Sequence, residues 1–259
     1  MRICNLSSGS DGNLTYIETS TTKILVDVGL SCKETTKRLS LLNVTPSEIN
    51  AVLITHEHSD HIKGVDNFCS KFNIPVYVHE NGKEKLENKL VKNIRIIPFT
   101  DYNFTIGNIE VEPFPVPHDV VRCTGYSFIE NQKKISIVTD LGHTTPEIIK
   151  NLSNSVLVYL EANHDVDLLL KNPNYPLTLK NRILGNKGHL SNHTCAETIF
   201  ELIKSGTRQV VLSHLSKENN SPSLAYESIV SDLLKYGVKE GEHIKIDVAT
   251  TNPGAIFKL

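Results

Sequence analysis

The stretch "NAVLITHEHSDHIKG" (residues 50–64) joins an apolar run to a dense cluster of side chains that can bind a metal ion. The apolar run predicts a buried β-strand. Directly after it, His56, His58, Asp60 and His61 form the pattern His-x-His-x-Asp-His. Zinc and related divalent metals bind imidazole nitrogen and carboxylate oxygen. The stretch therefore predicts a metal centre at the carboxyl end of a strand.

The geometry of a turn explains how four ligands so close in sequence can serve two metal ions. A tight turn after the strand directs His56 and His58 to one point, and Asp60 and His61 to a second. Two simpler interpretations are a solvated turn that is rich in histidine by composition alone, and a single metal ion with spare histidines. The match to a spaced ligand pattern directly after an apolar strand favours two metal ions over both.

Two metal ions need more ligands than this stretch supplies, and three further candidates stand at the ends of predicted strands. His118 follows "EVEPFPVP", Asp140 ends "ISIVTD" and His214 ends "VVLSH". Each of them alone is typical of an ordinary polar loop. With the cluster they predict one site from His56, His58, His118 and Asp140, and another from Asp60, His61, Asp140 and His214, with Asp140 as the bridge.

Composition sets broad limits on the class of protein. The chain has 259 residues, 39% apolar and 22% charged, which is enough for one large domain or two small ones. We expect neither a signal peptide nor a membrane span, because no long apolar run is present. The five scattered cysteines form no CxxC pair, which favours the reducing cytoplasm over a disulfide framework or a cysteine-zinc site. The net charge of −2 gives no overall signal for nucleic acid, so an anionic partner needs a local patch or a metal.

Short apolar strands alternate with helical patterns along the chain, and residues 94–130 are dominated by strands. Residues 134–142 and 155–165 form nearly continuous apolar strands, which is typical of a buried sheet. Asn192 is the predicted N-cap of a long helix. This interleaving predicts two mixed sheets flanked by helices. The predicted helices span residues 32–43, 61–72, 80–90, 144–152, 192–206 and 221–237.

The order of these ligands resembles the metallo-β-lactamase superfamily. The resemblance covers the whole chain and implies an αββα sandwich formed by residues 1–259 as a single domain. Asp27, in "DVG", matches a buried aspartate that supports the histidine turn in that superfamily. Asp140 stands where the true zinc β-lactamases have cysteine, as in the binuclear hydrolases. The segment between Asp140 and His214 leaves no room for an inserted β-CASP domain.

Several long strings resemble the YycJ/WalJ type within this superfamily, which are bacterial 5′-exonucleases acting on DNA. The resemblance implies a nucleic-acid partner, DNA, and cleavage from the 5′ end. Neither property follows from the residues themselves. The strings are "SSGSDGN" (7–13), "VPHD" (116–119), "YLEANHD" (159–165), "YPLTLKNRILGNKGHLSN" (175–192) and "LSHLSKENNSP" (212–222).

The predicted chemistry is attack by an activated water, or hydroxide, on a phosphodiester. Asp60 would orient this water or accept its proton while also binding metal. His189 is the predicted general acid, by resemblance to an extra histidine of related phosphodiesterases. Ser191 and Asn192 either bind a phosphate oxygen at a helix N-terminus or only cap that helix.

Substrate contacts are predicted from charge. Residues 168–196 contain no acidic side chain. We interpret this segment as a basic loop in which Lys180 and Arg182 follow a polynucleotide backbone and Tyr175 stacks on a base. The alternative is a set of ordinary solvated cations. His164 either contacts substrate or donates a hydrogen bond to a metal ligand. The remaining histidines are predicted to be surface or structural residues, namely His79, His143, His193 and His243.

The first functional prediction is a binuclear exodeoxyribonuclease that holds two divalent ions, Zn, Mn or Fe. The first alternative is a phosphodiesterase of the PhnP type, which opens small cyclic phosphates. A second alternative is a thioester hydrolase of the glyoxalase II type, which uses similar ligands. A non-enzymatic module with a structural metal site is a third, although structural zinc sites are usually closed. The sequence gives no indication of the oligomeric state.

Overall fold

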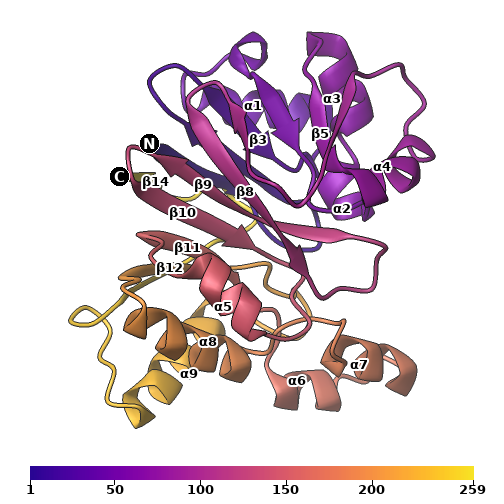
Figure 1. The fold of residues 1–259 in the computed structure, drawn as a ribbon. Helices are drawn as coiled ribbons and strands as arrows, with labels where there is room; N and C mark the ends of the chain where they lie inside the picture. Colours follow the sequence, from indigo (N-terminus) through magenta and orange to yellow (C-terminus); the bar gives the residue numbers. More distant parts are fainter.

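Two seven-stranded β-sheets lie face to face in the computed structural model, which describes residues 1–259 (Figure 1). The N and C termini lie side by side, because β1 and β14 pair antiparallel. The first sheet, in the order β14-β1-β2-β3-β4-β5-β6, contains β1 (Arg2–Ser7), β2 (Leu14–Glu18), β3 (Lys23–Val26), β4 (Ala51–Leu53), β5 (Val76–His79), β6 (Ile96–Phe99) and β14 (Ile256–Lys258). The second, in the order β13-β12-β11-β10-β9-β8-β7, contains β7 (Phe104–Ile106), β8 (Ile109–Val116), β9 (Cys123–Glu130), β10 (Lys133–Val138), β11 (Leu157–Glu161), β12 (Gln209–Ser213) and β13 (Lys245–Val248).

Helices cover the outer face of each sheet (Figure 1). Those on the first sheet are α1 (Cys32–Ser40), α3 (Val65–Phe72) and α4 (Glu80–Glu87). Those on the second are α5 (Pro146–Leu152), α8 (Asn192–Lys204) and α9 (Pro222–Lys235). The shorter helices are the 3₁₀ helix η1 (Pro46–Glu48), α2 (Ser59–Ile62), α6 (Val166–Lys171) and α7 (Leu177–Leu184).

Three hydrophobic cores separate the four layers. Because side chains alternate between the two faces of a strand, one strand contributes side chains to two of these cores. In β11, Leu157 and Tyr159 pack between the sheets, whereas Val158 and Leu160 pack under α8 and α9. A third core lies between the first sheet and its helices. The predicted sandwich of two mixed sheets flanked by helices is therefore confirmed.

The direction of the strands determines where the predicted ligands lie. In the second sheet β8, β10, β11 and β12 run in the same direction, because β8 and β10 are both antiparallel to β9 and the others are parallel to β10. In the first sheet β3 and β4 are parallel. The carboxyl ends of β4, β8, β10 and β12 lead into the segments that carry the predicted ligands. The fold thus collects residues that are far apart in sequence at one end of the sandwich.

The structure corrects three local predictions. The predicted basic loop 168–196 is not a loop throughout, because it contains the end of α6, all of α7 and the start of α8. The N-cap of α8 is Ser191, whose side chain accepts from the amide of Thr194, and Asn192 is the first helical residue. The predicted helix 61–72 is broken into α2 and α3 around Gly64, where a Cβ atom would lie 1.9 Å from the carbonyl oxygen of Leu30.

All five cysteines are unpaired, as predicted. No helix combines the length and the apolar character that crossing a membrane requires.

Candidate metal centre

The seven predicted ligands lie together where loops from both sheets meet. The ligand atoms of His56, His58 and His118 lie within 4.8 Å of one another. Those of Asp60, His61 and His214 form a second group within the same limit. The first group combines the loop after β4 with the end of β8, and the second combines α2, which follows that loop, with the end of β12. Each group therefore joins the two sheets.

Asp140 lies between the two groups. Its Oδ2 is 3.2 Å from Nε2 of His61, and its Oδ1 is 3.7 Å from Nε2 of His118 and 3.7 Å from Nδ1 of His214. It is buried and follows β10 by two residues. One carboxylate thus reaches ligands of both predicted sites.

Three residues of this region have left-handed backbone conformations, which residues other than glycine seldom adopt. Asp27 has φ 59°, Asp140 has φ 57° and His214 has φ 56°. All three follow the ends of strands. Such strain persists where the surrounding structure enforces it, and it is concentrated at functional sites.

The unpaired polar atoms of the centre fit a bound cation. Nε2 of His56 and Nε2 of His214 are buried and have no hydrogen-bond partner in the protein. Burial of a polar atom without a partner is unfavourable. Lone pairs of imidazole and carboxylate that converge in this way match the donors preferred by zinc and by other divalent transition metals. The residues present therefore fit the divalent ions that the fold implies.

Asp27 fixes the orientation of His61. Oδ2 of Asp27 accepts a hydrogen bond of 2.7 Å from Nδ1 of His61, and Oδ1 accepts one of 2.9 Å from the amide of Thr55. The hydroxyl of Thr55 also donates to this carboxylate. Because Nδ1 of His61 is engaged, its Nε2 is left to face Asp60 and Asp140. Contacts of this kind orient metal-binding histidines.

Glu161, the last residue of β11, is a central residue of the site that the sequence did not identify. It shares the inward face of its strand with Leu157 and Tyr159, and it is completely buried. Oε1 of Glu161 accepts hydrogen bonds of 2.9 Å from Nδ1 of His189 and 2.7 Å from Nδ1 of His214. Burial disfavours its charge, but the two histidines outweigh burial and lower its pKa to about 2.

Backbone amides also hold Glu161. The amide of Leu141 donates to Oε2 at 2.7 Å, that of Leu190 donates to Oε2 at 3.0 Å, and that of Asp140 donates to Oε1 at 3.2 Å. One carboxylate thus ties the Asp140 loop to the His189 loop. The sequence did contain a signal for Glu161, namely a carboxylate on the inward face of an apolar strand. A fully buried acid requires polar partners, so this position indicates a buried polar site.

Replacing Glu161 by glutamine should weaken both the fold and metal binding. One carboxylate oxygen becomes an NH₂ group, which cannot accept from the surrounding amides and histidines. We expect a loss of about 1–3 kcal/mol in the free energy of unfolding, measured with urea. We also expect metal affinity to fall about 10- to 100-fold, measured by competition with a chelator. The control Glu112→Gln alters a partly exposed ion pair with Lys134 and should change stability by less than about 0.5 kcal/mol. Wild-type behaviour of Glu161→Gln would contradict this role.

The histidines of the centre differ in charge. Burial opposes protonation of His61 and His214, but neighbouring carboxylates outweigh burial and raise the pKa of both well above the ordinary value. For His61 these are Asp27, Asp140 and Asp60. Burial, followed by the charge on His61, lowers the pKa of His56 well below its ordinary value.

Metal binding should therefore release protons at neutral pH. With raised pKa values, His61 and His214 are protonated in the metal-free protein, whereas a histidine must be neutral to bind metal. Metal affinity should fall as the pH falls, because protons compete for the same nitrogens. Titration calorimetry with Zn²⁺ or Mn²⁺ in two buffers of different ionisation enthalpy measures the released protons. Identical apparent enthalpies in the two buffers would show that no proton is lost.

A cleft of about 140 Å³ opens beside the centre. His118 and His189 line its metal side, and Tyr175 and Arg182 line the side formed by α7 and the segment before it. Arg182 forms an ion pair with Asp119, which also lines the cleft. No residue of α7 is fully buried. The predicted base-stacking and backbone-binding residues thus adjoin the predicted ligands.

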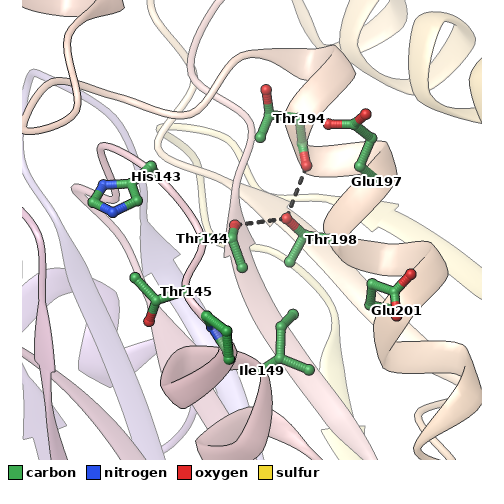
Figure 2. A pocket seen from close by; sticks show the side chains of 9 residues that line it. His143, Thr144, Thr145, Ile149, Thr194, Glu197, Thr198 and Glu201 are labelled. Atoms are coloured by element: carbon green, nitrogen blue, oxygen red, sulfur yellow. Dashed lines mark hydrogen bonds between the residues drawn. The ribbon is translucent and has the colours of Figure 1, made fainter.

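A larger hollow of about 520 Å³ lies away from the ligands, between the start of α5 and α8. Figure 2 shows Thr144, Thr198 and Thr194 joined by hydrogen bonds on its wall, with Glu197 and Glu201 beside them. It contains none of the predicted ligands, and its two carboxylates disfavour a phosphate. The smaller cleft beside the metal centre is the better candidate for a substrate site.

The structure places the other predicted contact residues partly inside the protein. His164 is 1% exposed, so it offers substrate no free surface in this conformation. Ser191 caps α8, and Asn192 is buried against Asn220. Lys180 donates to the carbonyl of Leu170. Contact of these residues with substrate stays a prediction.

The remaining histidines have other partners. His79 caps α4, and His143 donates to the carbonyl of Asn186. His193 pairs with Asp232, and the amide of Lys239 donates to His243. None of the four joins the two ligand groups.

Comparison with known proteins agrees with this fold and site. The family described as "Beta-lactamase superfamily domain" matches residues 22–215. The chain belongs to this superfamily, and it is a metal-dependent hydrolase.

Two relatives resemble it over most of its length. The chain is 38% identical to "Exodeoxyribonuclease WalJ" of Streptococcus pneumoniae serotype 2 (strain D39 / NCTC 7466) over 246 residues, which cover 93% of this chain and 91% of that protein. It is 36% identical to "Exodeoxyribonuclease YycJ" of Bacillus anthracis over 249 residues, which cover 93% and 92%. The predicted resemblance to the YycJ/WalJ type is confirmed.

Among solved structures, the metallo-beta-lactamase fold protein YhfI from Bacillus subtilis aligns with a TM-score of 0.76 at 16% identity. The alignment covers 99% of both chains. At this identity the likeness supports the fold alone.

Proposed function

We propose that this chain is a DNA exonuclease that uses two divalent metal ions to hydrolyse phosphodiester bonds from the 5′ end. The observation that carries the proposal is the position of Asp140, one carboxylate within 3.7 Å of histidines from both ligand groups. The names of the WalJ and YycJ relatives supply the class of substrate. The polarity is carried over from the resemblance to that type.

The residues of the centre divide into two sets. In this proposal Asp140 belongs to both sets, and the ligand atoms accept Zn, Mn or Fe. When bound, such a pair of ions lowers the pKa of a water and polarises the phosphoryl oxygen. Two carboxylates offset only half of the charge of two divalent ions, so the centre attracts a phosphodiester anion. One set is His56, His58, His118 and Asp140, and the other is Asp60, His61, His214 and Asp140.

Asp60 is suited to orient the attacking water. Its side chain is partly exposed at the centre, with Oδ2 3.3 Å from Nε2 of His61 and 3.5 Å from Nε2 of His214. Burial disfavours its charge, but these histidines outweigh burial and lower its pKa. Asp60 is therefore ionised at neutral pH.

His189 is suited to protonate the leaving oxygen. Its ring centroid lies 5.3 Å from that of His118 and 5.4 Å from that of His214, at the edge of the cleft. Glu161 accepts from its Nδ1, which leaves Nε2 for substrate. Burial lowers the pKa of His189, but Glu161 outweighs burial and raises it above the ordinary value. The raised pKa favours the protonated imidazole that a general acid requires.

A small-molecule phosphodiesterase is the second candidate function. The observation that favours it is the size of the cleft, about 140 Å³, which suits a compact phosphodiester. The Arg182 and Tyr175 side chains and the acid-free segment 168–196 favour a polynucleotide instead.

The test of the proposal is cleavage of DNA and RNA oligonucleotides labelled at the 5′ or the 3′ end. Metal-depleted protein is refilled with Mn²⁺ or Zn²⁺ before the assay. We expect mononucleotides to appear first from the 5′ label on DNA. The Asp60→Ala variant should be inactive. Release from the 3′ label first would overturn the polarity, and turnover of small cyclic phosphates alone would overturn the nuclease assignment.

Salt separates the two candidate substrates. Each phosphate that a protein neutralises on a polynucleotide releases counterions, so affinity falls steeply as salt rises. We expect KM for an oligonucleotide to increase at least about tenfold between about 50 and about 200 mM KCl. A chromogenic bis-aryl phosphate, which carries one charge, should show little change over the same range. The same dependence of KM on salt for both substrates would favour the small-molecule phosphodiesterase.

A further inference from the structure

The space between the sheets changes from apolar to polar directly beneath the metal centre. In β1, Ile3 packs in the core between the sheets, and the next inward residue is Asn5. In β12, Val211 packs in the same core, and the next inward residue is Ser213. With Tyr159 of β11, the polar residues of these strands line a cavity of about 20 Å³.

Three residues that line this cavity each have a buried polar atom without a hydrogen-bond partner in the protein. The atoms are Oδ1 of Asn5, the hydroxyl of Tyr159 and Oγ of Ser213, and all three residues are more than nine-tenths buried. The amide nitrogen of Asn5 donates to the carbonyl of Ser7 at 2.9 Å, which fixes the side chain with Oδ1 as its unpaired end. Unpaired polar atoms are rare in protein interiors, and three that line one cavity indicate a shared partner.

We propose that this cavity is a binding site for one water molecule. Its volume is close to what a single water requires, and a buried water commonly makes about three hydrogen bonds. The water would donate to Oδ1 of Asn5 and accept from the hydroxyls of Tyr159 and Ser213. A metal cation would use the three oxygen lone pairs but would leave both hydroxyl protons without an acceptor. An apolar occupant would satisfy none of the three atoms.

The position of this water gives it a role in holding the centre. Ser213 immediately precedes His214, Thr139 immediately precedes Asp140, and both line the cavity with Asp27. The water would join β1 of the first sheet to β11 and β12 of the second, just below the loops that carry the ligands. The proposal does not depend on the substrate of the enzyme.

A high-resolution crystal structure of the wild-type protein tests the site. We expect one spherical density peak in the cavity, with contacts of about 2.6–3.2 Å to the three unpaired atoms. A cavity without density would overturn the proposal. A peak with additional oxygen neighbours at about 2.3–2.6 Å would identify a hard cation and would also overturn it.

A double variant, Tyr159→Phe with Ser213→Ala, removes two of the three partners and should lose the peak. Tm should fall by about 2–4 °C. The control Tyr126→Phe removes another buried hydroxyl, which donates directly to the carbonyl of Ile54 at 2.6 Å and does not line the cavity. The control should keep the peak. An occupied cavity in the double variant would show that these hydroxyls do not hold the water.

Discussion

Replacing Asp140 by asparagine is expected to slow cleavage about a thousandfold and to reduce the metal content of the protein. Asparagine has nearly the same shape and tolerates the left-handed backbone at this position, so folding should be preserved. It lacks the negative charge that a ligand shared by two cations supplies. A metal ion contributes several kcal/mol to such reactions. A loss of about 4 kcal/mol corresponds to about a thousandfold reduction in kcat/KM.

The measurements are metal content by mass spectrometry and cleavage of labelled DNA. Circular dichroism verifies that the variant is folded. The matched control is Asp119→Asn, which neutralises another carboxylate 3.4 Å from Nε2 of His118. Asp119 belongs to neither proposed ligand set, so this control should retain two metal ions per chain. If Asp140→Asn also retains two ions and cuts DNA at the wild-type rate, Asp140 is not the shared ligand.

Replacing His189 by alanine should slow the cleavage of DNA far more than that of an activated substrate. General acid catalysis contributes about 10²- to 10⁴-fold. A deoxyribose oxygen is a poor leaving group and needs the proton, whereas an acidic phenol leaves readily as its anion. We therefore expect kcat on DNA to fall about a hundredfold or more. On a bis-aryl phosphate with an acidic phenol, the expected loss is less than about tenfold.

His193→Ala is the control for this prediction. His193 is an exposed histidine near the start of α8 that pairs with Asp232 outside the cleft. Its loss should leave both rates nearly unchanged. Equal slowing of the two substrates by His189→Ala would remove His189 from the acid role. It would indicate instead that the side chain supports the geometry of the centre through Glu161.

The proximity of the predicted ligands could be foreseen because each of them follows a strand that is recognisable from its apolar residues. His118, Asp140 and His214 come after strands that run in the same direction, so the order of ligands in the chain maps onto one end of the sheet. Sequence also indicated the layered fold, through apolar runs that are buried on both faces. In these regions local pattern and tertiary burial agree.

The remaining features depend on contacts that local patterns do not encode. Helix α7 has no fully buried residue. Its sequence therefore lacks the apolar stripe by which a helix is recognised. Glu161 resembles an ordinary acidic residue at the end of a strand until Leu141, Leu190 and the two histidines converge on it. The unpaired atoms of Asn5 and Ser213 meet only when the two sheets pack together.

Both ligand groups draw on both sheets, so neither half of the sandwich has a complete centre by itself. A partly synthesised or partly unfolded chain lacks His214 or holds it far from the histidine turn. Such a chain cannot assemble the pair of ions on which the proposed cleavage depends. In the proposed nuclease, cleavage therefore requires a complete and correctly folded chain.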